Sequence, residues 1–249
     1  MWTFPRFWRG FWRKQVKIMD ERTKRRETRK YCFTVEGQTE KWYLQWLENQ
    51  IRTAPDAKYI ASIHTKVESD PQKYAKRVNP VTTPKVTHLC DYECDDGFHI
   101  QRFQNVLKKL KNANSTKGRK LKYSLGYSNY TFELWVILHK RDCRAVQTDR
   151  KKYLSFINQI FGEQFAGLSE YKEENNFKRC LSKLNIEDVK LAIHRSQEIM
   201  QNNRDTKTPV EYMGFTYYRD NPSLSIWESV KDILIDCGLM DGDPTPVRP

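Results

Sequence analysis

The stretches YCFTVEGQTE (31–40) and VTHLCDYECDD (86–96) decide the fold that this sequence predicts. Each begins with a short run of apolar and β-branched residues, which is typical of a buried strand, and each then turns acidic. Gly37 ends the first run, and aromatic and aliphatic residues then recur at the spacing of one helix face from Trp42 to Ile51. The two stretches therefore predict strands that lead into helices.

Outward from these stretches, strands and helices alternate through the first 130 residues. YIASIH (59–64) and KYSLGY (122–127) have the composition of strands, and the apolar spacing between 100 and 110 predicts a helix. Three prolines between 69 and 85 predict that this segment is mostly loop. Such alternation is typical of a mainly parallel sheet with crossover helices, so we expect an α/β fold.

The second half of the chain predicts mostly helices. FELWVILH (132–139) is the most apolar run and predicts a buried helix, and apolar spacing marks further helices near 154–161, 186–200 and 226–237. We therefore expect three parts. They are a basic, aromatic arm over 1–30, an α/β core over 31–140, and a helical portion over 141–249 that packs on the core.

The charge of the chain is strongly positive and uneven. Its 249 residues contain 44 Lys and Arg against 31 Asp and Glu, a net charge of +13. The first 30 residues hold 11 basic and 3 acidic side chains, which is +8 of that total. Such an arm indicates a polyanionic partner, either nucleic acid or an anionic membrane surface.

The first 18 residues, MWTFPRFWRGFWRKQVKI, leave two interpretations open. Tryptophans between arginines suit an anchor at a membrane interface, and the same pattern suits an extension that precedes the folded part. No apolar run approaches the ~20 residues that cross a bilayer, and no secretory signal is evident. We therefore expect no transmembrane segment and a cytoplasmic location.

The cysteines favour reduced thiols over a disulfide scaffold. There are six in 249 residues, and no two of them form a CxxC pair. His88, Cys90, Cys94 and His99 form a set of soft ligands in sequence, with a Cys90-x₃-Cys94 spacing that zinc sites use. Small apolar fillers in the core are the favoured interpretation of the thiols, and zinc is the weaker one.

The carboxylates after the two decisive strands are the candidate site. In a parallel sheet, functional groups collect beyond the carboxyl ends of the strands, so Glu36, Asp91 and Glu93 are expected to converge. Clustered carboxylates repel one another unless a cation neutralises them, and oxygen ligands suit Mg²⁺ or Mn²⁺. Such ions assist phosphodiester chemistry. The alternative is that Glu36 caps a helix and the acidic run is a solvated turn.

These residues resemble a known family. EGQTE (36–40) after one strand and DYE (91–93) after another resemble a Toprim domain. SNYTFELWVILH (128–139) resembles the SNPxFExWxxxH block of the RloB-like family of bacterial defence proteins, and NPS (221–223) is similar to that family's C-terminal block. The resemblance covers residues 29–238. It departs at Glu93, where an aspartate is usual, and at Tyr130, where the block has proline.

The resemblance implies a Toprim-like fold and a metal-dependent nuclease of an anti-phage, abortive-infection type system, with a companion ATPase encoded in the same system. It implies Mg²⁺ (or Mn²⁺) on Glu36, Asp91 and Glu93, and a substrate that is DNA or RNA, tRNA included. The departure at Glu93 keeps an alternative open: a catalytically weak subunit that binds nucleic acid or a partner. The sequence leaves open which nucleic acid is cut and whether the chain forms an oligomer.

Five basic residues are expected to contact the nucleic-acid backbone: Arg25, Arg26, Lys117, Arg119 and Lys120. Glu133 and His139 are further catalytic candidates, as a metal ligand and as a phosphate contact or proton carrier. The alternative is that both brace the packing of their helix. Because a buried carboxylate needs a partner, we expect Glu133 to lie toward Glu36 and Asp91, within about 10 Å, with His139 or Asn129 as a donor.

Overall fold

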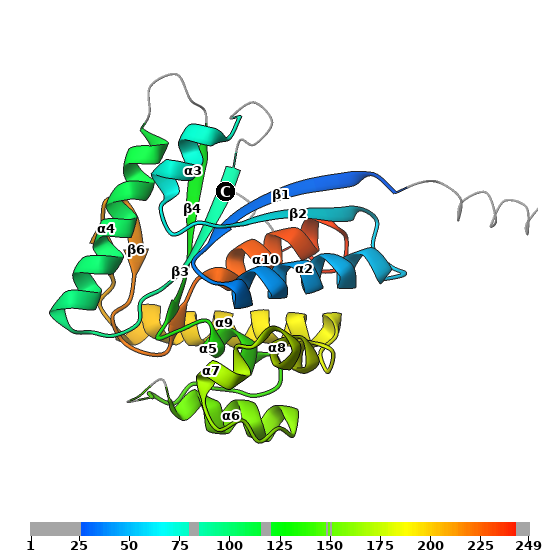
Figure 1. The fold of residues 1–249 in the computed structure, drawn as a ribbon. Coiled ribbons are helices and arrows are strands. Elements are labelled where there is room, and N and C mark those ends of the chain that lie inside the picture. Colours follow the sequence, from blue (N-terminus) through cyan, green and yellow to red (C-terminus); the bar gives the residue numbers. More distant parts are fainter. Residues whose placement is uncertain (1–25, 80–84, 116–120, 148, 150, 243–249) are drawn as a thin grey trace, which may run out of the picture.

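The computed structural model describes residues 26–79, 85–115, 121–147, 149 and 151–242. At its centre is a five-stranded sheet with the order β2-β1-β3-β4-β7 (Figure 1). The first four strands in that order are parallel, and β7 pairs antiparallel with β4. The bounds of these strands are β1 Thr28–Val35, β2 Ile60–Val67, β3 Lys85–Asp91, β4 Lys122–Asn129 and β7 Ser223–Leu224. The expected mainly parallel α/β fold is confirmed.

Helices cover both faces of this sheet because its strands are apolar on both sides. Phe33 and Val35 of β1 belong to one hydrophobic core, whereas Cys32 belongs to a second core on the opposite face. The first core includes residues of α2 (Gln38–Thr53) and α10 (Ile226–Asp236). The second includes residues of α3 (Pro71–Arg77) and α4 (Gly97–Asn114), which lie together at the left of Figure 1.

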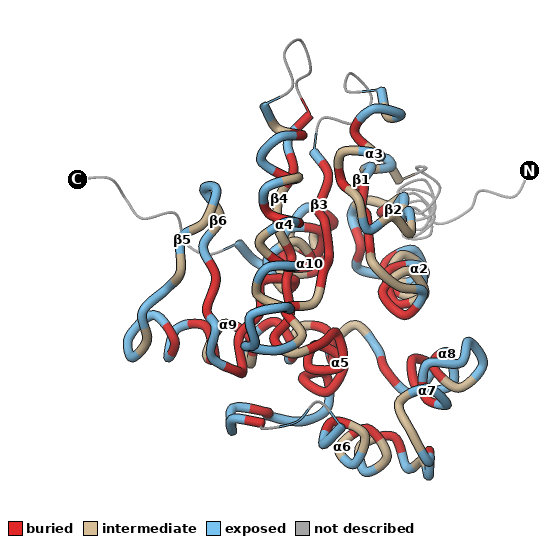
Figure 2. Tube along the Cα trace, turned by 60° about the vertical axis from the view of Figure 1, so that its left-hand side comes forward, coloured by how far each residue is buried: buried red, intermediate tan, exposed pale blue. Residues whose placement is uncertain are grey.

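The second half adds a group of helices below the sheet in Figure 1. Its members are α5 Glu133–Leu138, α6 Lys152–Phe161, α7 Leu168–Tyr171, α8 Glu174–Leu181 and α9 Ile186–Thr206. All six residues of α5 are buried, as expected of the most apolar run, and Figure 2 shows α5 enclosed by its neighbours. The first core continues from β1 through α5 to α10, so the helical portion shares its core with the sheet.

Three local features differ from the sequence-based expectation. Helix α3 lies in the segment expected to be mostly loop. There the Asp70 side chain accepts hydrogen bonds from the backbone of Gln72 and Lys73, and proline is favourable in a first helical turn. Strand β1 begins at Thr28, so the end of the expected arm belongs to the sheet. A hairpin of β5 (Val210–Tyr212) and β6 (Phe215–Tyr217) and the short helices α7 and α8 were not predicted.

Candidate active site

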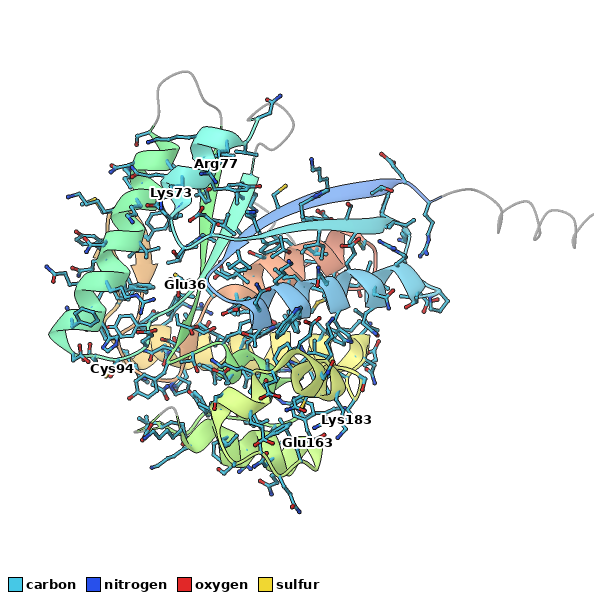
Figure 3. All side chains as sticks on the ribbon, viewed as in Figure 1. Glu36, Lys73, Arg77, Cys94, Glu163 and Lys183 are labelled. Carbon is cyan, nitrogen blue, oxygen red and sulfur yellow. The ribbon has the colours of Figure 1, made fainter. Side chains whose placement is uncertain are left out.

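The first two carboxylates meet because their strands are neighbours. Val35 pairs with Leu89, which places Glu36 just beyond the end of β1 beside Asp91, the last residue of β3. The backbone N–H of Asp91 donates to Glu36 Oε2 at 3.4 Å. Glu36 lies at the middle of the molecule in Figure 3, between the start of α2 and α4. The expected convergence of Glu36 and Asp91 at the carboxyl edge is therefore observed.

A third carboxylate, Glu40, comes from the first turn of α2. It is buried, and the Thr39 hydroxyl donates to its Oε2 at 3.0 Å. The side chain folds back over Gly37, where an added Cβ would stand 2.8 Å from Glu40 Oε2. The lack of a side chain at Gly37 thus leaves room for the Glu40 carboxylate. Sequence analysis did not select Glu40, because acidic residues are common in the first turn of a helix, where their charge interacts favourably with the helix dipole.

A fourth carboxylate, Glu133, is the fully buried first residue of α5. Lys172, which follows α7, places its Nζ 3.0 Å from Glu133 Oε1. Glu133 Oε2 has no hydrogen-bond partner among the described residues. Neither expected donor, His139 or Asn129, bonds to Glu133. Lys172 is its ion-pair partner instead. Sequence analysis could not distinguish Lys172 from ordinary surface charge, because nothing near it in sequence indicates a buried partner.

These four residues, Glu36, Glu40, Asp91 and Glu133, form what we call the acidic cluster. Burial raises the pKa of Asp91 well above its usual range, and the charges of Glu40, Glu133 and Glu36 raise it further. Burial also raises the pKa of Glu40, with Glu133 adding to the effect, and that of Glu36. Burial lowers the pKa of Lys172, but Glu133, Asp91 and Glu40 more than offset this and leave it raised. Glu133 therefore lies on the Asp91 side of the sheet edge, as expected.

Glu93, expected to share the metal, lies near enough to Glu36 for its charge to help raise the pKa of Glu36, but its carboxylate is paired with basic side chains. Its backbone adopts a positive φ of 64°, which turns the chain away from the line of β3. Both of its carboxylate oxygens lie 3.1 Å from Arg102 Nη1, and Oε2 lies 3.1 Å from His99 Nε2. Glu40 and Glu133 therefore lie near Asp91 in addition to the expected residues, and Glu93 stays a predicted ligand whose carboxylate is paired with Arg102 and His99.

His139 lies in the core, with contacts that fit the alternative role of bracing its helix. It is fully buried, with Nδ1 2.9 Å from the Trp135 carbonyl oxygen and Nε2 3.0 Å from the Tyr43 hydroxyl. Burial lowers the pKa of His139 to about 4, so the ring is neutral at physiological pH. Nδ1–H then donates to Trp135, and Nε2 accepts from Tyr43. Both nitrogens are occupied, which leaves none for a phosphate or a moving proton.

Arg26 also differs from its expected role. Its guanidinium donates to the backbone carbonyl oxygens of Arg52, Ala54 and Ala57, at distances of 2.5–3.2 Å. It fastens the end of α2 to the start of β1 instead of facing a nucleic acid. The other four residues expected to contact nucleic acid lie outside the described residues: Arg25, Lys117, Arg119 and Lys120.

An open cavity of about 380 Å³ runs from Glu36 along α4. Its lining is Glu36, Ser69, Phe98, Gln101, Arg102, Asn105, Val106 and Lys109. Phe98 stands at the start of α4 with 70% of its surface exposed, and no other described aromatic residue is exposed. The acidic cluster thus opens onto a polar groove with an aromatic side chain in it.

The family model for RloB-like proteins matches residues 31–233, most of the chain. The chain belongs to the RloB-like protein family. No curated protein and no solved structure matches it significantly. Among the described residues, the helices are too short or too polar to cross a membrane.

In this RloB-like chain, the two blocks that carried the resemblance pack against each other. The Asn221 side chain donates to the Asn129 carbonyl oxygen at 2.9 Å and to the Tyr153 hydroxyl at 3.0 Å. The Asn129 side chain donates to the Arg219 carbonyl oxygen at 2.6 Å. These contacts fix the connection from β4 to α5. They therefore set the position of Glu133 at the start of α5.

The donor set of the acidic cluster suits a hard divalent cation. All its donors are carboxylate oxygens, and Glu133 Oε2 has no hydrogen-bond partner among the described residues. The only three ligand atoms within 4.8 Å of one another in the described part belong to Cys94, Asp96 and His99. No three carboxylates of the acidic cluster lie that close together, as mutual repulsion favours.

Replacing Asp91 by asparagine should stabilise the metal-free protein. Because the folded-state pKa of Asp91 is raised, the unfolded chain releases this proton first, and wild type loses stability as pH rises from about 4. The variant avoids that loss. We expect its free energy of unfolding in EDTA to exceed that of wild type by about 1–2 kcal/mol at pH 7, with a smaller difference at pH 4.

Urea unfolding at both pH values measures this difference. Asp56→Asn is the matched control, because Asp56 is exposed and its replacement should not change the pH dependence. If Asp91→Asn and wild type showed parallel pH profiles, the carboxylates would not be repelling one another.

Proposed function

We propose that this chain is a Toprim-type, divalent-cation-dependent nuclease that hydrolyses phosphodiester bonds of nucleic acid in a bacterial anti-phage defence system. The observation that carries the proposal is the acidic cluster, in which four carboxylates from two strand ends and two helix starts face one another. Repulsion among these carboxylates destabilises the folded protein unless a bound cation neutralises them. Membership of the RloB-like family supports the proposal.

The residues that would hold Mg²⁺ or Mn²⁺ are Glu36 and Asp91, with Glu40 and Glu133 beside them. When bound, the ion supplies charge neutralisation at the phosphate and a water of lowered pKa. The protein's own groups have further roles. Glu40, whose pKa is raised, is suited to accept a proton from water near neutral pH. The Lys172 ammonium is partly exposed and is suited to contact a phosphate oxygen beside Glu133.

The groove along α4 is the proposed path of the substrate. Glu36 lines it, so a strand lying in it would pass the acidic cluster. An exposed phenylalanine offers a face on which an unpaired base stacks, and Arg102 offers a contact for phosphate. Bases in a duplex are already stacked on each other. The groove therefore favours single-stranded nucleic acid, or a loop of a folded RNA, over duplex DNA.

The alternative function, a catalytically weak binding subunit, rested on glutamate at position 93 in place of aspartate. Nuclease activity is the preferred proposal, because Glu40 and Glu133 supply further carboxylates near Asp91 whatever the role of Glu93, which pairs with Arg102 and His99. A companion ATPase of the same defence system, which the family resemblance implies, would act as sensor or activator of the nuclease.

Cleavage should depend on the acidic cluster and on a divalent cation. We expect Glu36→Gln and Asp91→Asn each to lower the cleavage rate of RNA or single-stranded DNA by at least about 10²-fold. EDTA should abolish cleavage. Glu93→Gln is the matched control and should retain activity within about tenfold of wild type, because the Glu93 carboxylate is already paired with Arg102 and His99.

The assay uses purified full-length chain with and without the companion ATPase, and far-UV circular dichroism confirms that each variant is folded. Full activity of a folded Asp91→Asn variant, or full activity in EDTA, contradicts the proposed mechanism.

Phe98 should contribute to binding rather than to chemistry. Stacking of one base on an aromatic side chain is worth about 1–3 kcal/mol, so we expect Phe98→Ala to weaken binding of single-stranded oligonucleotide at least fivefold. Phe98→Trp should restore it. Fluorescence anisotropy in EDTA measures binding without cleavage, and Leu191→Ala, which removes an exposed leucine of α9, is the control. Equal weakening by both alanine variants would show that Phe98 has no special contact.

A further inference from the structure

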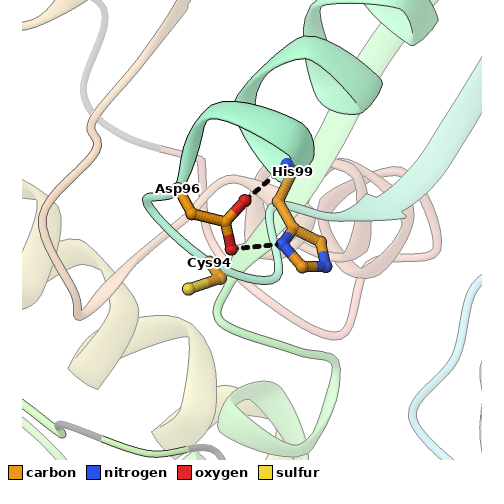
Figure 4. Close-up of side chains that lie close together, drawn as sticks. All are labelled: Cys94, Asp96 and His99. Carbon is orange, nitrogen blue, oxygen red and sulfur yellow. Dashed lines mark hydrogen bonds and ion pairs between the residues drawn. The ribbon is translucent and has the colours of Figure 1, made fainter.

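The loop between β3 and α4 brings together three side chains of different chemistry. Cys94, Asp96 and His99 each place a possible metal ligand within 4.8 Å of the others, as Figure 4 shows. They come from one short segment at the entry to α4, close to the strand end that carries Asp91. The set differs from the soft-ligand set suggested by the sequence, because His88 and Cys90 are buried in the sheet.

A second contact orients the Asp96 carboxylate. Asp96 Oδ1 accepts hydrogen bonds from the backbone N–H groups of Phe98 and His99, both at 3.0 Å, and so caps α4. This leaves Oδ2 facing His99 Nδ1 at 2.7 Å. Capping occupies Oδ1, and Oδ2 is the oxygen that the His99 imidazole approaches.

A carboxylate also orients the imidazole of His99. His99 Nε2 lies 3.1 Å from Glu93 Oε2, and Arg102 holds Glu93 in turn. Metal-bound histidines characteristically donate their other ring N–H to a carboxylate, which fixes the ring and the tautomer. Glu93 has that position here. The positive φ of Glu93, which turns the chain from the line of β3, is compatible with this position.

The charges around His99 also suit a cation. A carboxylate oxygen faces each ring nitrogen, Asp96 Oδ2 at Nδ1 and Glu93 Oε2 at Nε2. A divalent cation at Nδ1 would be attracted by Asp96 while Nε2–H donates to Glu93.

We propose that Cys94 Sγ, Asp96 Oδ2 and His99 Nδ1 form a site for a zinc-class divalent cation, with a water in the fourth position. Thiolate and imidazole favour Zn²⁺ over Mg²⁺, so this site and the all-carboxylate acidic cluster select different ions. The bound ion would tie the loop that follows Asp91 to the first turn of α4. This site is separate from the proposed nuclease chemistry and does not depend on it.

Cys94 makes the site directly measurable. It is the one exposed cysteine of the six, since the other five are buried. A thiol reagent such as Ellman's reagent should therefore react with Cys94 first in the native, reduced protein. We expect equimolar Zn²⁺ to slow this reaction at least about tenfold, and millimolar Mg²⁺ to leave it unchanged.

Two variants distinguish zinc bound by all three side chains from zinc bound by the Cys94 thiolate alone. His99→Ala should keep the reactivity of Cys94 and lose its protection by Zn²⁺. His64→Ala, which removes an exposed histidine of β2, should retain full protection. Binding of Co²⁺ supplies a second readout, with thiolate-to-cobalt charge-transfer absorption in wild type and none in Cys94→Ser.

Two results would overturn the proposal. One is a wild-type Cys94 whose reactivity Zn²⁺ does not change. The other is protection that persists undiminished in His99→Ala, because the imidazole would then not be a ligand. Neither result bears on cleavage by the acidic cluster, so the two proposals stand or fall separately.

Discussion

The repulsion among four carboxylates at the carboxyl edge of the sheet is the constraint on which the rest of the site depends. Glu40 and Glu133 are buried, Glu36 and Asp91 are half-buried, and each carboxylate hinders the ionisation of others. Lys172 offsets part of this charge through its contact with Glu133. Such a cluster lowers the stability of the folded protein. Clusters of this kind are typical of sites that bind a cation or transfer protons.

The surrounding packing holds the cluster in place. Parallel pairing of β1 and β3 brings Glu36 to Asp91, and the close approach at Gly37 admits Glu40. Helix α5 presents Glu133 from the centre of the core, where Trp135 and His139 pack edge-on. Several residues of the family-type blocks therefore act by positioning the reactive groups. His139 is an example, since both of its ring nitrogens have partners within the protein, and Asn129 is another, since its side-chain amide donates to the Arg219 carbonyl oxygen.

Much of this arrangement could be predicted from the sequence, because apolar runs and strand ends are local signals. The four parallel strands, the principal helices and the meeting of Glu36 with Asp91 followed from them. The pairing of Glu93 with Arg102 and His99 could not be foreseen, because glutamate gives little local sign of the positive φ that it adopts. Glu40 and Lys172 were missed because their roles depend on segments that are distant in sequence, up to 132 residues apart, and meet only in the folded chain.

The ligand set of the acidic cluster is the central claim, and direct binding of Mn²⁺ tests it independently of any substrate. The measurement is a titration of Mn²⁺ into the full-length protein at neutral pH, with free ion followed by electron paramagnetic resonance. The account predicts that Glu40→Gln weakens the tightest Mn²⁺ site by at least about tenfold and that Glu93→Gln leaves it nearly unchanged. Loss of that site in Glu93→Gln with full retention in Glu40→Gln would contradict the account.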